Sequence, residues 1–328
     1  MKLEVIILDT QKKYMHMYLH NRVKKWSSIR KNIKLSYQLY IIIALPLAWL
    51  FIFRYIPMYG VQIAFRNFKA NKGILGSDWI GLTNFIKFFN SYNFSRVIRN
   101  TLIISIYDLL VGFPFPIILA LALNNTRHAR FKKTVQMVTY MPHFISMVVM
   151  VGMILQFLSP KIGFINQMIS MFGGTKKDFL ADPKYFSSIY VWSDIWQGCG
   201  WATIIYLAAL SGISPEMHEA AIIDGANRFQ RMLYIDVPGI VPTITILLIM
   251  NSGYIMNVGF EKAFLLQNNL NLDASEIIST YTYKMGLASA GADFSYASAI
   301  GLFNSVVNVI LITIVNFLAK KTSQTSLW

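Results

Sequence analysis

Six stretches of about 20 residues each are strongly apolar and carry almost no charged side chains. A helix needs roughly 20 apolar residues to cross the hydrocarbon core of a bilayer. Helices and closed barrels are the structures that satisfy their backbone hydrogen bonds there. The sequence therefore predicts an all-α integral membrane protein with six transmembrane helices, at about residues 36–56, 98–123, 134–158, 188–210, 238–257 and 297–319.

The composition excludes two other classes of protein. Of 328 residues, 55% are hydrophobic and 14% are charged, whereas a soluble chain usually carries about a quarter charged residues. The formal net charge is nonetheless +15, but nucleic-acid-binding proteins do not combine such a charge with long uncharged apolar runs. We therefore expect membrane lipid, and not nucleic acid, as a partner. Cys199 is the only cysteine, so neither an intrachain disulfide nor a cysteine-based metal site is expected.

The basic residues indicate the orientation in the membrane. Nine lysines and arginines precede Ser36, and four more lie in the short loop between residues 124 and 134. Short loops rich in Lys and Arg stay on the cytoplasmic side, where they also attract anionic lipid. We therefore predict a multi-pass protein of the bacterial cell membrane with both termini cytoplasmic, residues 1–35 forming a basic N-terminal segment and residues 320–328 the tail.

The loop between the fourth and fifth predicted spans has an unusual order of helix signals. Ser214 is a typical N-cap, and Pro215 suits the first helical position. Gly225 has no Cβ and can turn the chain. A second helical stretch, over residues 227–234, is expected to end near Pro238, because proline disfavours helix in the residue before it. The sequence predicts helix, turn and helix on the cytoplasmic face.

The same loop resembles the EAA loop of ABC-importer permeases, whose pattern is EAA-x3-G-x9-I-x-LP. This sequence matches the pattern at every fixed position except Val237, which replaces leucine. The resemblance implies a permease fold of type I, with a cytoplasmic coupling helix that docks on an ATP-binding subunit. The residues that we assign to this coupling are Glu219, Ala220, Ala221, Asp224, Gly225, Ile235 and Pro238. The alternative is a cytoplasmic hairpin that only connects two spans.

The resemblance extends over most of the chain. From about residue 24 onward, segments such as LPLAWLFIF, DWIGLTNFIKFF and YMPHFIS are similar to carbohydrate permeases of the LplB type, within the MetI-like class. It implies that residues 36–97 form the first transmembrane helix with a long outer loop, and that residues 98–319 form the permease core. The implied function is ATP-driven import of oligo- or polysaccharide fragments into the cytoplasm. The implied partners are a second, homologous permease in a heterodimer, two ATP-binding subunits and an external sugar-binding lipoprotein.

The chain itself has no features of an enzyme. A phosphate-cradling loop of the form GxxxxGK[ST] is absent from the sequence. We therefore expect no cofactor on this chain and assign ATP and Mg to the partner ATPase subunits. Two alternatives remain open: the YtcP-type partner permease of the same importer class, and a transporter or channel that works without ATP. Transporters of the latter kind often show inverted repeats, and none is evident.

Polar and aromatic side chains inside the predicted spans are candidates for the substrate path. Polar groups are costly to place toward lipid, and sugars require hydrogen-bonding groups together with flat apolar faces. The candidates are Tyr190, Trp192, Asp194, Trp196, Gln197, Trp201, Asn251, Tyr254, Asn257, Asn304 and Asn308. Alternatively, the asparagines join helices and the tryptophans form the interfacial belt.

Two further polar features have open interpretations. Asp108 lies in the second predicted span, where it lines the path or is paired within the bundle. The third predicted loop carries lysines that would suit an acidic sugar, although a solvated loop or a contact with the binding protein explains them equally well. These lysines are Lys161, Lys176, Lys177 and Lys184. The sequence is compatible with both neutral and acidic sugars.

Overall fold

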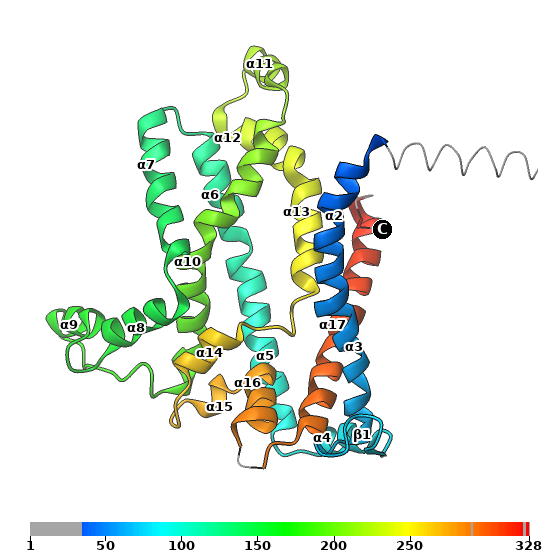
Figure 1. Cartoon of the computed structure of the whole chain (residues 1–328). Coiled ribbons are helices and arrows are strands. Elements are labelled where there is room, and N and C mark those ends of the chain that lie inside the picture. The colour runs from blue at the N-terminus through cyan, green and yellow to red at the C-terminus, as the bar shows by residue number, and fades with distance from the viewer. Residues whose placement is uncertain (1–34, 290, 324–325, 328) are drawn as a thin grey trace, which may run out of the picture. The chain divides into compact units, whose positions relative to one another are not determined.

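The computed structural model describes residues 35–289, 291–323 and 326–327 (Figure 1). The chain divides into two compact units, Met1–Gln62 and Ile63–Trp328. The predicted basic segment 1–35 lies almost entirely outside the described residues. The first unit contains α2 (Tyr37–Leu50), the π-helical η1 (Phe51–Tyr55), α3 (Ile56–Met58) and the start of the 3-10 helix η2 (Tyr59–Phe65). This continuous helical run is long and apolar enough to cross a membrane, as predicted for the first span.

Three further helical runs among the described residues are long and apolar enough to cross a membrane by themselves. They are α5–η3–α6 (Phe94–Tyr107, Asp108–Gly112, Pro114–Asn124), α12–η5–α13 (Arg228–Arg231, Met232–Asp236, Val237–Ser252) and α17 (Phe294–Ser323). Two bent pairs also qualify, namely α7–η4 (Ala129–Tyr140, Met141–Phe144) with α8 (Met147–Leu158), and α10 (Pro183–Ser211) with α11 (Pro215–Ile223). With each pair counted as one span, the described residues hold up to six, which agrees with the predicted all-α membrane fold.

The third predicted span is not a straight helix, because η4 and α8 meet at 102°. Ile145 and Ser146 at the bend are extended, and the Ser146 hydroxyl accepts a hydrogen bond from the backbone N–H of Val149 at 3.4 Å. Pro142, just before the bend, has no N–H to continue a helix. The span predicted over residues 134–158 is therefore a broken helix, because a proline and an N-cap serine outweigh the uniform apolar composition.

Three of the membrane helices contain a π-helical turn that ends two residues before a proline. η1 precedes Pro57, η3 precedes Pro114 and η5 precedes Pro238. A proline ring has no N–H and clashes with the carbonyl four residues earlier, and a local π adjustment accommodates both effects inside a membrane helix. The prediction that the second helical stretch ends near Pro238 is therefore wrong, because η5 carries the helix on into α13.

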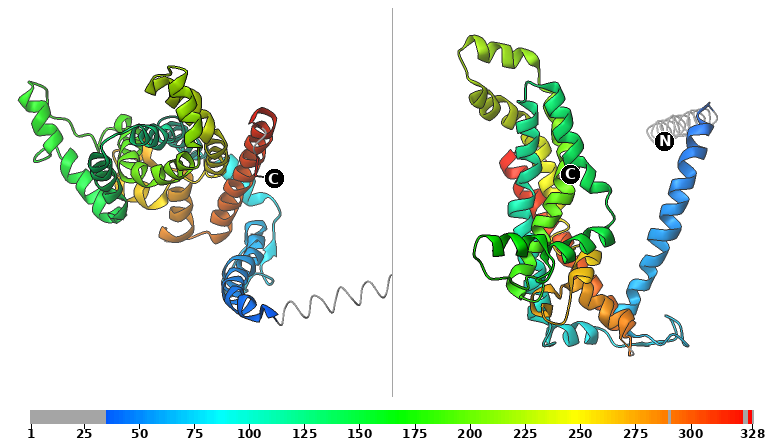
Figure 2. Two further views of the ribbon diagram at one scale, coloured as in Figure 1. Left: turned by 90° about the horizontal axis from the view of Figure 1, so that it is seen from above. Right: turned by 90° about the vertical axis from the view of Figure 1, so that its left-hand side faces the viewer.

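The remaining elements of the second unit are short and lie mostly at the end of the unit opposite α11 (Figure 1). β1 and β2 pair antiparallel. The elements are β1 (Arg66–Asn67), β2 (Asp78–Trp79), α4 (Thr83–Phe89), α9 (Phe164–Met171), α14 (Phe260–Leu266), α15 (Leu272–Ser275), α16 (Ile278–Tyr283) and the π-helical η6 (Lys284–Ala288). At the other end, α11 bends away from α10 by 70° and projects beyond the ends of the neighbouring helices (Figure 2).

Buried polar contacts fix α15 and α16 on α5. The buried carboxylate of Glu276 bonds to the guanidinium of Arg96 on α5 and lies 3.7 Å from the ammonium of Lys284. Asn100, one turn further along α5, donates to the carbonyl oxygens of Asp273 and Glu276 at 2.7 and 3.0 Å. A buried charge is tolerated when it is paired and hydrogen-bonded in this way. These contacts hold the segment that includes α14 against the membrane helices.

α10 is the central helix of the second unit and packs on α5, α6, α7 and α13. Its buried side chains join two apolar clusters, one around Val191 with α5, α8 and α14, and the other around Tyr206 with α6 and α13. Gly200 lets α7 approach closely, because an added Cβ would lie 2.1 Å from the carbonyl oxygen of Thr139. A cavity opens along α10 between the two clusters.

Candidate functional site

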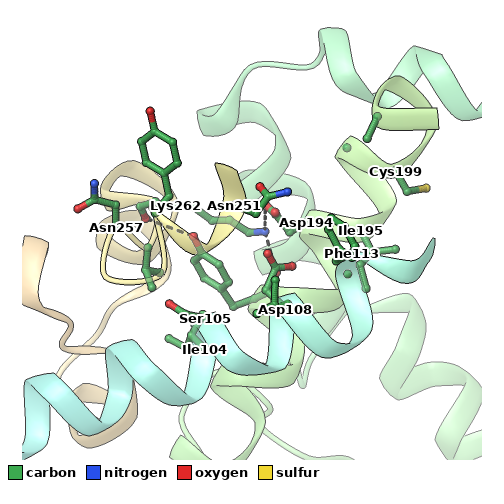
Figure 3. A pocket seen from close by; sticks show the side chains of 18 of the residues that line it. Ile104, Ser105, Asp108, Phe113, Asp194, Ile195, Cys199, Asn251, Asn257 and Lys262 are labelled. Carbon is green, nitrogen blue, oxygen red and sulfur yellow. Dashed lines mark hydrogen bonds and ion pairs between the residues drawn. The ribbon is translucent and has the colours of Figure 1, made fainter. Parts of the chain in front are cut away.

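The cavity has a volume of about 740 Å³ and is walled by η3, α10, the segment that follows α13, and α14 (Figure 3). Ligand pockets in proteins typically have volumes of about 300–1,000 Å³ and combine apolar walls with a few polar groups. The polar and charged residues of this cavity include Ser105, Asp108, Tyr190, Asp194, Asn251, Asn257, Glu261 and Lys262. Its composition therefore suits a ligand that has both hydroxyl groups and apolar faces.

An ion pair between α14 and α10 forms one side of the cavity. The ammonium of Lys262 lies 3.0 Å from Asp194 Oδ1 and donates to the carbonyl oxygen of Tyr190 at 2.7 Å. It also lies 4.4 Å from the centre of the Tyr190 ring. Lys262 is 1% exposed, whereas the side chain of Asp194 is 45% exposed. Burial lowers the pKa of Lys262, and the negative charges of Asp194 and Asp108 oppose this shift.

Asp108 stands at the first position of the π turn η3 and faces the cavity (Figure 3). Gly112, at the end of the same turn, leaves room for this carboxylate, because a Cβ there would lie 2.3 Å from Asp108 Oδ1. Gly259 has the same relation to Tyr190: a Cβ there would lie 2.9 Å from the hydroxyl, which donates to the Gly259 carbonyl at 3.4 Å. Two glycines thus allow polar side chains into the cavity wall.

Six of the eleven predicted substrate-path residues line the cavity: Tyr190, Asp194, Trp201, Asn251, Tyr254 and Asn257. The last three meet there although α13 stops at Ser252 and residues 253–257 are not helical. Two backbone hydrogen bonds, from Tyr254 to the Asn251 carbonyl at 2.9 Å and from Asn257 to the Tyr254 carbonyl at 2.7 Å, keep them together. Non-helical backbone at membrane depth is tolerated where it lines a cavity. The contact of these residues with a sugar stays a prediction.

Three predicted amide residues lie outside the cavity and link their helices to non-helical segments nearby. Gln197 donates to the Ile145 carbonyl at the bend before α8, at 2.9 Å. Asn308 accepts a hydrogen bond from the backbone N–H of Met256 at 3.1 Å. Asn304 donates to the side chain of Asn257 at 2.6 Å and so orients a cavity residue. These three amides therefore have structural hydrogen bonds, in the manner of polar groups that hold membrane segments together, and their contact with a sugar stays a prediction.

The tryptophans of α10 separate into two groups. Trp201 lines the cavity and stacks on the ring of His143, with the ring centres 4.6 Å apart. Trp192 and Trp196 lie outside the cavity and are about half exposed. The indole N–H of Trp192 donates to the Tyr107 hydroxyl at 3.0 Å. Trp192 and Trp196 therefore do not provide the cavity with a stacking platform in this structure.

The sequence did not indicate Lys262 as a site residue, and it left the role of Asp108 open. The sequence feature that could have pointed to Lys262 is its position directly before the apolar run Ala263–Leu266. It lies outside the predicted spans, where lysines are usually exposed. Asp108, Asp194 and Lys262 are brought together by three separate elements, so no local spacing connects them.

At the far end of the unit, α11 begins and ends as the sequence predicts. The Ser214 hydroxyl accepts a hydrogen bond from the backbone N–H of Glu216 at 3.3 Å. Gly225 follows the helix with a φ of 81°, and the N–H of Ala226 donates to the Ala221 carbonyl at 2.8 Å, as in a Schellman motif. Both ends of this short projecting helix are therefore fixed by local hydrogen bonds.

The projecting end carries most of the predicted coupling residues on its surface. Glu219, Ala220, Asp224, Gly225 and Pro238 are exposed, whereas Ala221 and Ile235 are half-buried. Large apolar side chains are exposed beside them, namely Met217, Ile222, Ile223 and Phe229. We call these exposed apolar residues, together with Glu219, the α11 surface. An exposed apolar patch with polar residues around it is typical of a protein-binding surface.

A buried contact ties α11 to the membrane helices beneath it. Asp236, in η5, is 1% exposed, and its carboxylate lies 3.2 Å from Nε2 of His218 on α11. Asn125, just after α6, donates to the second oxygen of the same carboxylate at 3.3 Å. The carboxylate therefore connects α11, the end of α6 and the start of the helix that leads to the cavity. The sequence did not predict this contact.

The chain is similar to known membrane transport proteins over nearly its whole length. Residues 112–324 match the model of the family described as "Binding-protein-dependent transport system inner membrane component". Protein LplB of Bacillus subtilis (strain 168) is 42% identical over 290 residues, which cover 88% of this chain and 91% of LplB. The polygalacturonan/rhamnogalacturonan transport system permease protein YteP of the same organism is 41% identical over 307 residues, which cover 93% and 95% of the two chains.

Two solved structures have the same fold. One is a crystal structure of a bacterial ABC transporter involved in the import of the acidic polysaccharide alginate; a chain of it superposes with a TM-score of 0.82 at 40% identity, covering 90% of this chain and 99% of that chain. The other is the bacterial alginate ABC transporter in complex with an alginate pentasaccharide-bound periplasmic protein, with a TM-score of 0.83, 39% identity and the same coverage.

Proposed function

Because this chain belongs to the family of binding-protein-dependent transport system inner membrane components, we propose that it is a permease subunit of an ATP-driven importer of oligo- or polysaccharide fragments. The family match covers the membrane helices from α6 to α17. The carbohydrate class is supported by YteP and by the alginate transporter, which are named for polysaccharides. The cavity beside α10 supports it as well, since its lining combines hydroxyl, amide and carboxylate groups with aromatic rings.

The observation that carries the proposal is the α11 surface. This surface combines the EAA sequence with exposed apolar side chains at the projecting end of the unit. We propose that it docks on one of two separate ATP-binding subunits, which bind ATP and Mg and hydrolyse the nucleotide. Ala220 and Ala221 permit close approach of the partner, and Glu219 offers a charge to a partner cation.

The route from this docking surface to the cavity is short and continuous. His218 on α11 contacts the buried Asp236, and the helix of Asp236 runs through α13 to Asn251 on the cavity wall. A displacement of α11 would therefore reach the cavity through one helix. This arrangement suits a transporter in which the ATPase subunits change access to the sugar. Coupling between the docking surface and the cavity needs a structural element whose conformation depends on both of them, and this helix is such an element.

The other partners follow from the same assignment. A second, homologous permease would complete the path, and an external binding lipoprotein would deliver the sugar at the end of the unit opposite α11. That the alginate transporter was solved with a sugar-bound periplasmic protein supports this arrangement. With α11 on the cytoplasmic side, the protein lies in the bacterial cell membrane, and the excess of basic residues predicts that both termini are cytoplasmic.

Reconstitution of the complex with its neighbouring subunits tests this function. Glu219→Lys reverses the charge of the α11 surface, and we expect it to abolish ATP-dependent sugar uptake and sugar-stimulated ATP hydrolysis while membrane insertion is unchanged. Glu216→Lys reverses a neighbouring exposed acid on the same helix and serves as the matched control. Normal uptake by the Glu219 variant would refute the docking role, and uptake without any ATPase subunit would favour an ATP-independent transporter.

A further inference from the structure

The charges around the cavity are unbalanced. Among the residues that the structure describes, three carboxylates line it, those of Asp108, Asp194 and Glu261, against a single basic side chain, that of Lys262. From this arrangement we propose that the cavity accepts neutral saccharides and excludes uronic acids, and that Asp108 is the residue that sets this preference. The inference rests on the proposed transport function and adds to it the charge class of the substrate.

The cation that the described residues place in the cavity wall is already used by the protein. Lys262 is 1% exposed, and its ammonium donates to Asp194 and to the Tyr190 carbonyl while it lies over the Tyr190 ring. Two of its three donors are used by these oxygens, and the Tyr190 ring and the burial of the side chain leave no open side to the ammonium. A substrate carboxylate could therefore reach it only if the protein gave up one of these contacts. Removing one partner of a buried pair is strongly unfavourable. Lys262 therefore stabilises the wall and is not free to bind an acidic sugar.

Asp108, in contrast, is free to interact with a ligand. Among the described residues no side chain donates a hydrogen bond to its carboxylate, and the missing Cβ of Gly112 leaves the space that it occupies. A carboxylate accepts strong hydrogen bonds from hydroxyl groups, which every neutral sugar supplies. The carboxylate of a uronic acid would lose its hydration in the cavity without gaining a cation, and it would meet the like charges of Asp108 and Glu261.

The lysines of the third predicted loop do not change this balance. Lys161, Lys176, Lys177 and Lys184 are exposed, and none of them lines the cavity. The ammonium of Lys177 lies 3.5 Å from the Tyr185 hydroxyl on the surface. These lysines therefore supply no cation to the path along α10. The inferred substrate is opposite in character to the acidic polysaccharide for which the solved neighbour is named.

Uptake of matched sugars by the reconstituted complex tests the inference. The probes are a panel of neutral oligosaccharides, each paired with the uronic acid oligomer that differs only in oxidation at C6. The complex with its binding protein is assayed with the unchanged chain, with Asp108→Asn and with Asp78→Asn, which changes an exposed aspartate of β2 outside the cavity. We expect neutral members to be transported and uronic members to be rejected. Asp108→Asn should lower the neutral-to-uronic uptake ratio by about tenfold, the effect of removing one like charge, whereas Asp78→Asn should leave it unchanged.

The outcomes separate the two levels of the proposal. Uptake of a uronic member at the rate of its neutral counterpart overturns the charge preference and leaves the transport function intact. An unchanged ratio in Asp108→Asn overturns the assignment of Asp108, because the selection then lies elsewhere, as in the binding protein. Failure to transport any sugar, in a complex whose ATPase responds to the binding protein, overturns the carbohydrate function itself.

Discussion

At the scale of single residues, the two members of the cavity ion pair differ in their burial. Lys262 is enclosed, while Asp194 keeps almost half of its side chain exposed. A buried cation that loses its partner is costly, typically by about 3–5 kcal/mol, whereas an aspartate at a cavity wall can be solvated by water. The two single substitutions should therefore have unequal effects.

We expect Asp194→Asn to lower the unfolding temperature of the detergent-purified complex more than Lys262→Met does, with a loss of the order of 3 kcal/mol for the first. The double variant should recover much of the loss, because neither charge then remains without a partner. Thermal unfolding followed by intrinsic fluorescence measures all three. An equal or larger effect of Lys262→Met would contradict the burial argument.

A second prediction at the scale of single residues concerns His218 on α11. His218→Ala removes the imidazole whose Nε2 lies 3.2 Å from the buried Asp236 carboxylate, and a buried carboxylate with fewer polar neighbours costs about 1–3 kcal/mol. Since the same contact holds α11, we expect sugar uptake per ATP hydrolysed to fall. His218→Gln keeps a donor at a similar reach and should restore the ratio.

The control for this contact is His128→Ala, which changes an exposed histidine before α7. It should alter neither stability nor coupling. A loss of uptake in His218→Ala that Gln does not rescue would show that the Asp236 contact is not the cause.

At the scale of elements, the end of α11 depends on one backbone angle. Gly225 has a φ of 81°, and a Cβ there would meet nothing within 4 Å. The strain of a substitution therefore comes from the left-handed conformation alone, which costs roughly 1–2 kcal/mol for a residue with a Cβ. Gly152 in α8 also has open space around it but an ordinary φ, so the two glycines form a matched pair.

Gly225→Ala should reduce ATP-dependent uptake by about tenfold, the factor that corresponds to 1.4 kcal/mol, with normal amounts of protein in the membrane. Gly152→Ala should transport normally. Uptake by proteoliposomes that hold ATP inside, divided by the amount of assembled complex, is the measurement. Equal behaviour of the two variants would mean that the turn after α11 does not set its position.

At the scale of the whole molecule, alternating access predicts that the cavity wall changes its exposure with the nucleotide state. Tyr254 lines the cavity and is exposed, so Tyr254→Cys, in a Cys199→Ser background, places a single thiol there. We expect its labelling by a membrane-impermeant reagent to differ severalfold between the nucleotide-free complex and the complex trapped with ATP. Tyr92→Cys, in an exposed turn before α5, should label equally in both states. Equal labelling of Tyr254→Cys would argue against alternating access at this wall.

The sequence predicted the fold class and the two ends of α11, and the reasons are physical. A bilayer demands long apolar helices, so hydropathy alone locates most spans. The ends of α11 depend on Ser214 and Gly225, whose effects are local and can be recognised from neighbouring residues. The cavity could be predicted only in part, because Asp108, Asp194 and Lys262 line it together although they are about 70 or more positions apart in the chain. The 102° bend was missed because composition hid the local signals of Pro142 and Ser146.

The π turns before Pro57, Pro114 and Pro238 have a consequence for how these helices present their faces. An α-helix advances by 3.6 residues per turn, or about 100° per residue, and a π turn takes roughly one residue more. Each such turn therefore shifts the angular phase of everything beyond it by about 100°. Residues 228–231 and Asn251 belong to one continuous helix but lie on opposite sides of η5 along the chain. If a single helical wheel is aligned on residues 228–231, it therefore places Asn251 on the wrong face of the helix. Cross-linking pairs on either side of η5 should accordingly be designed on two wheels with an offset of one residue between them.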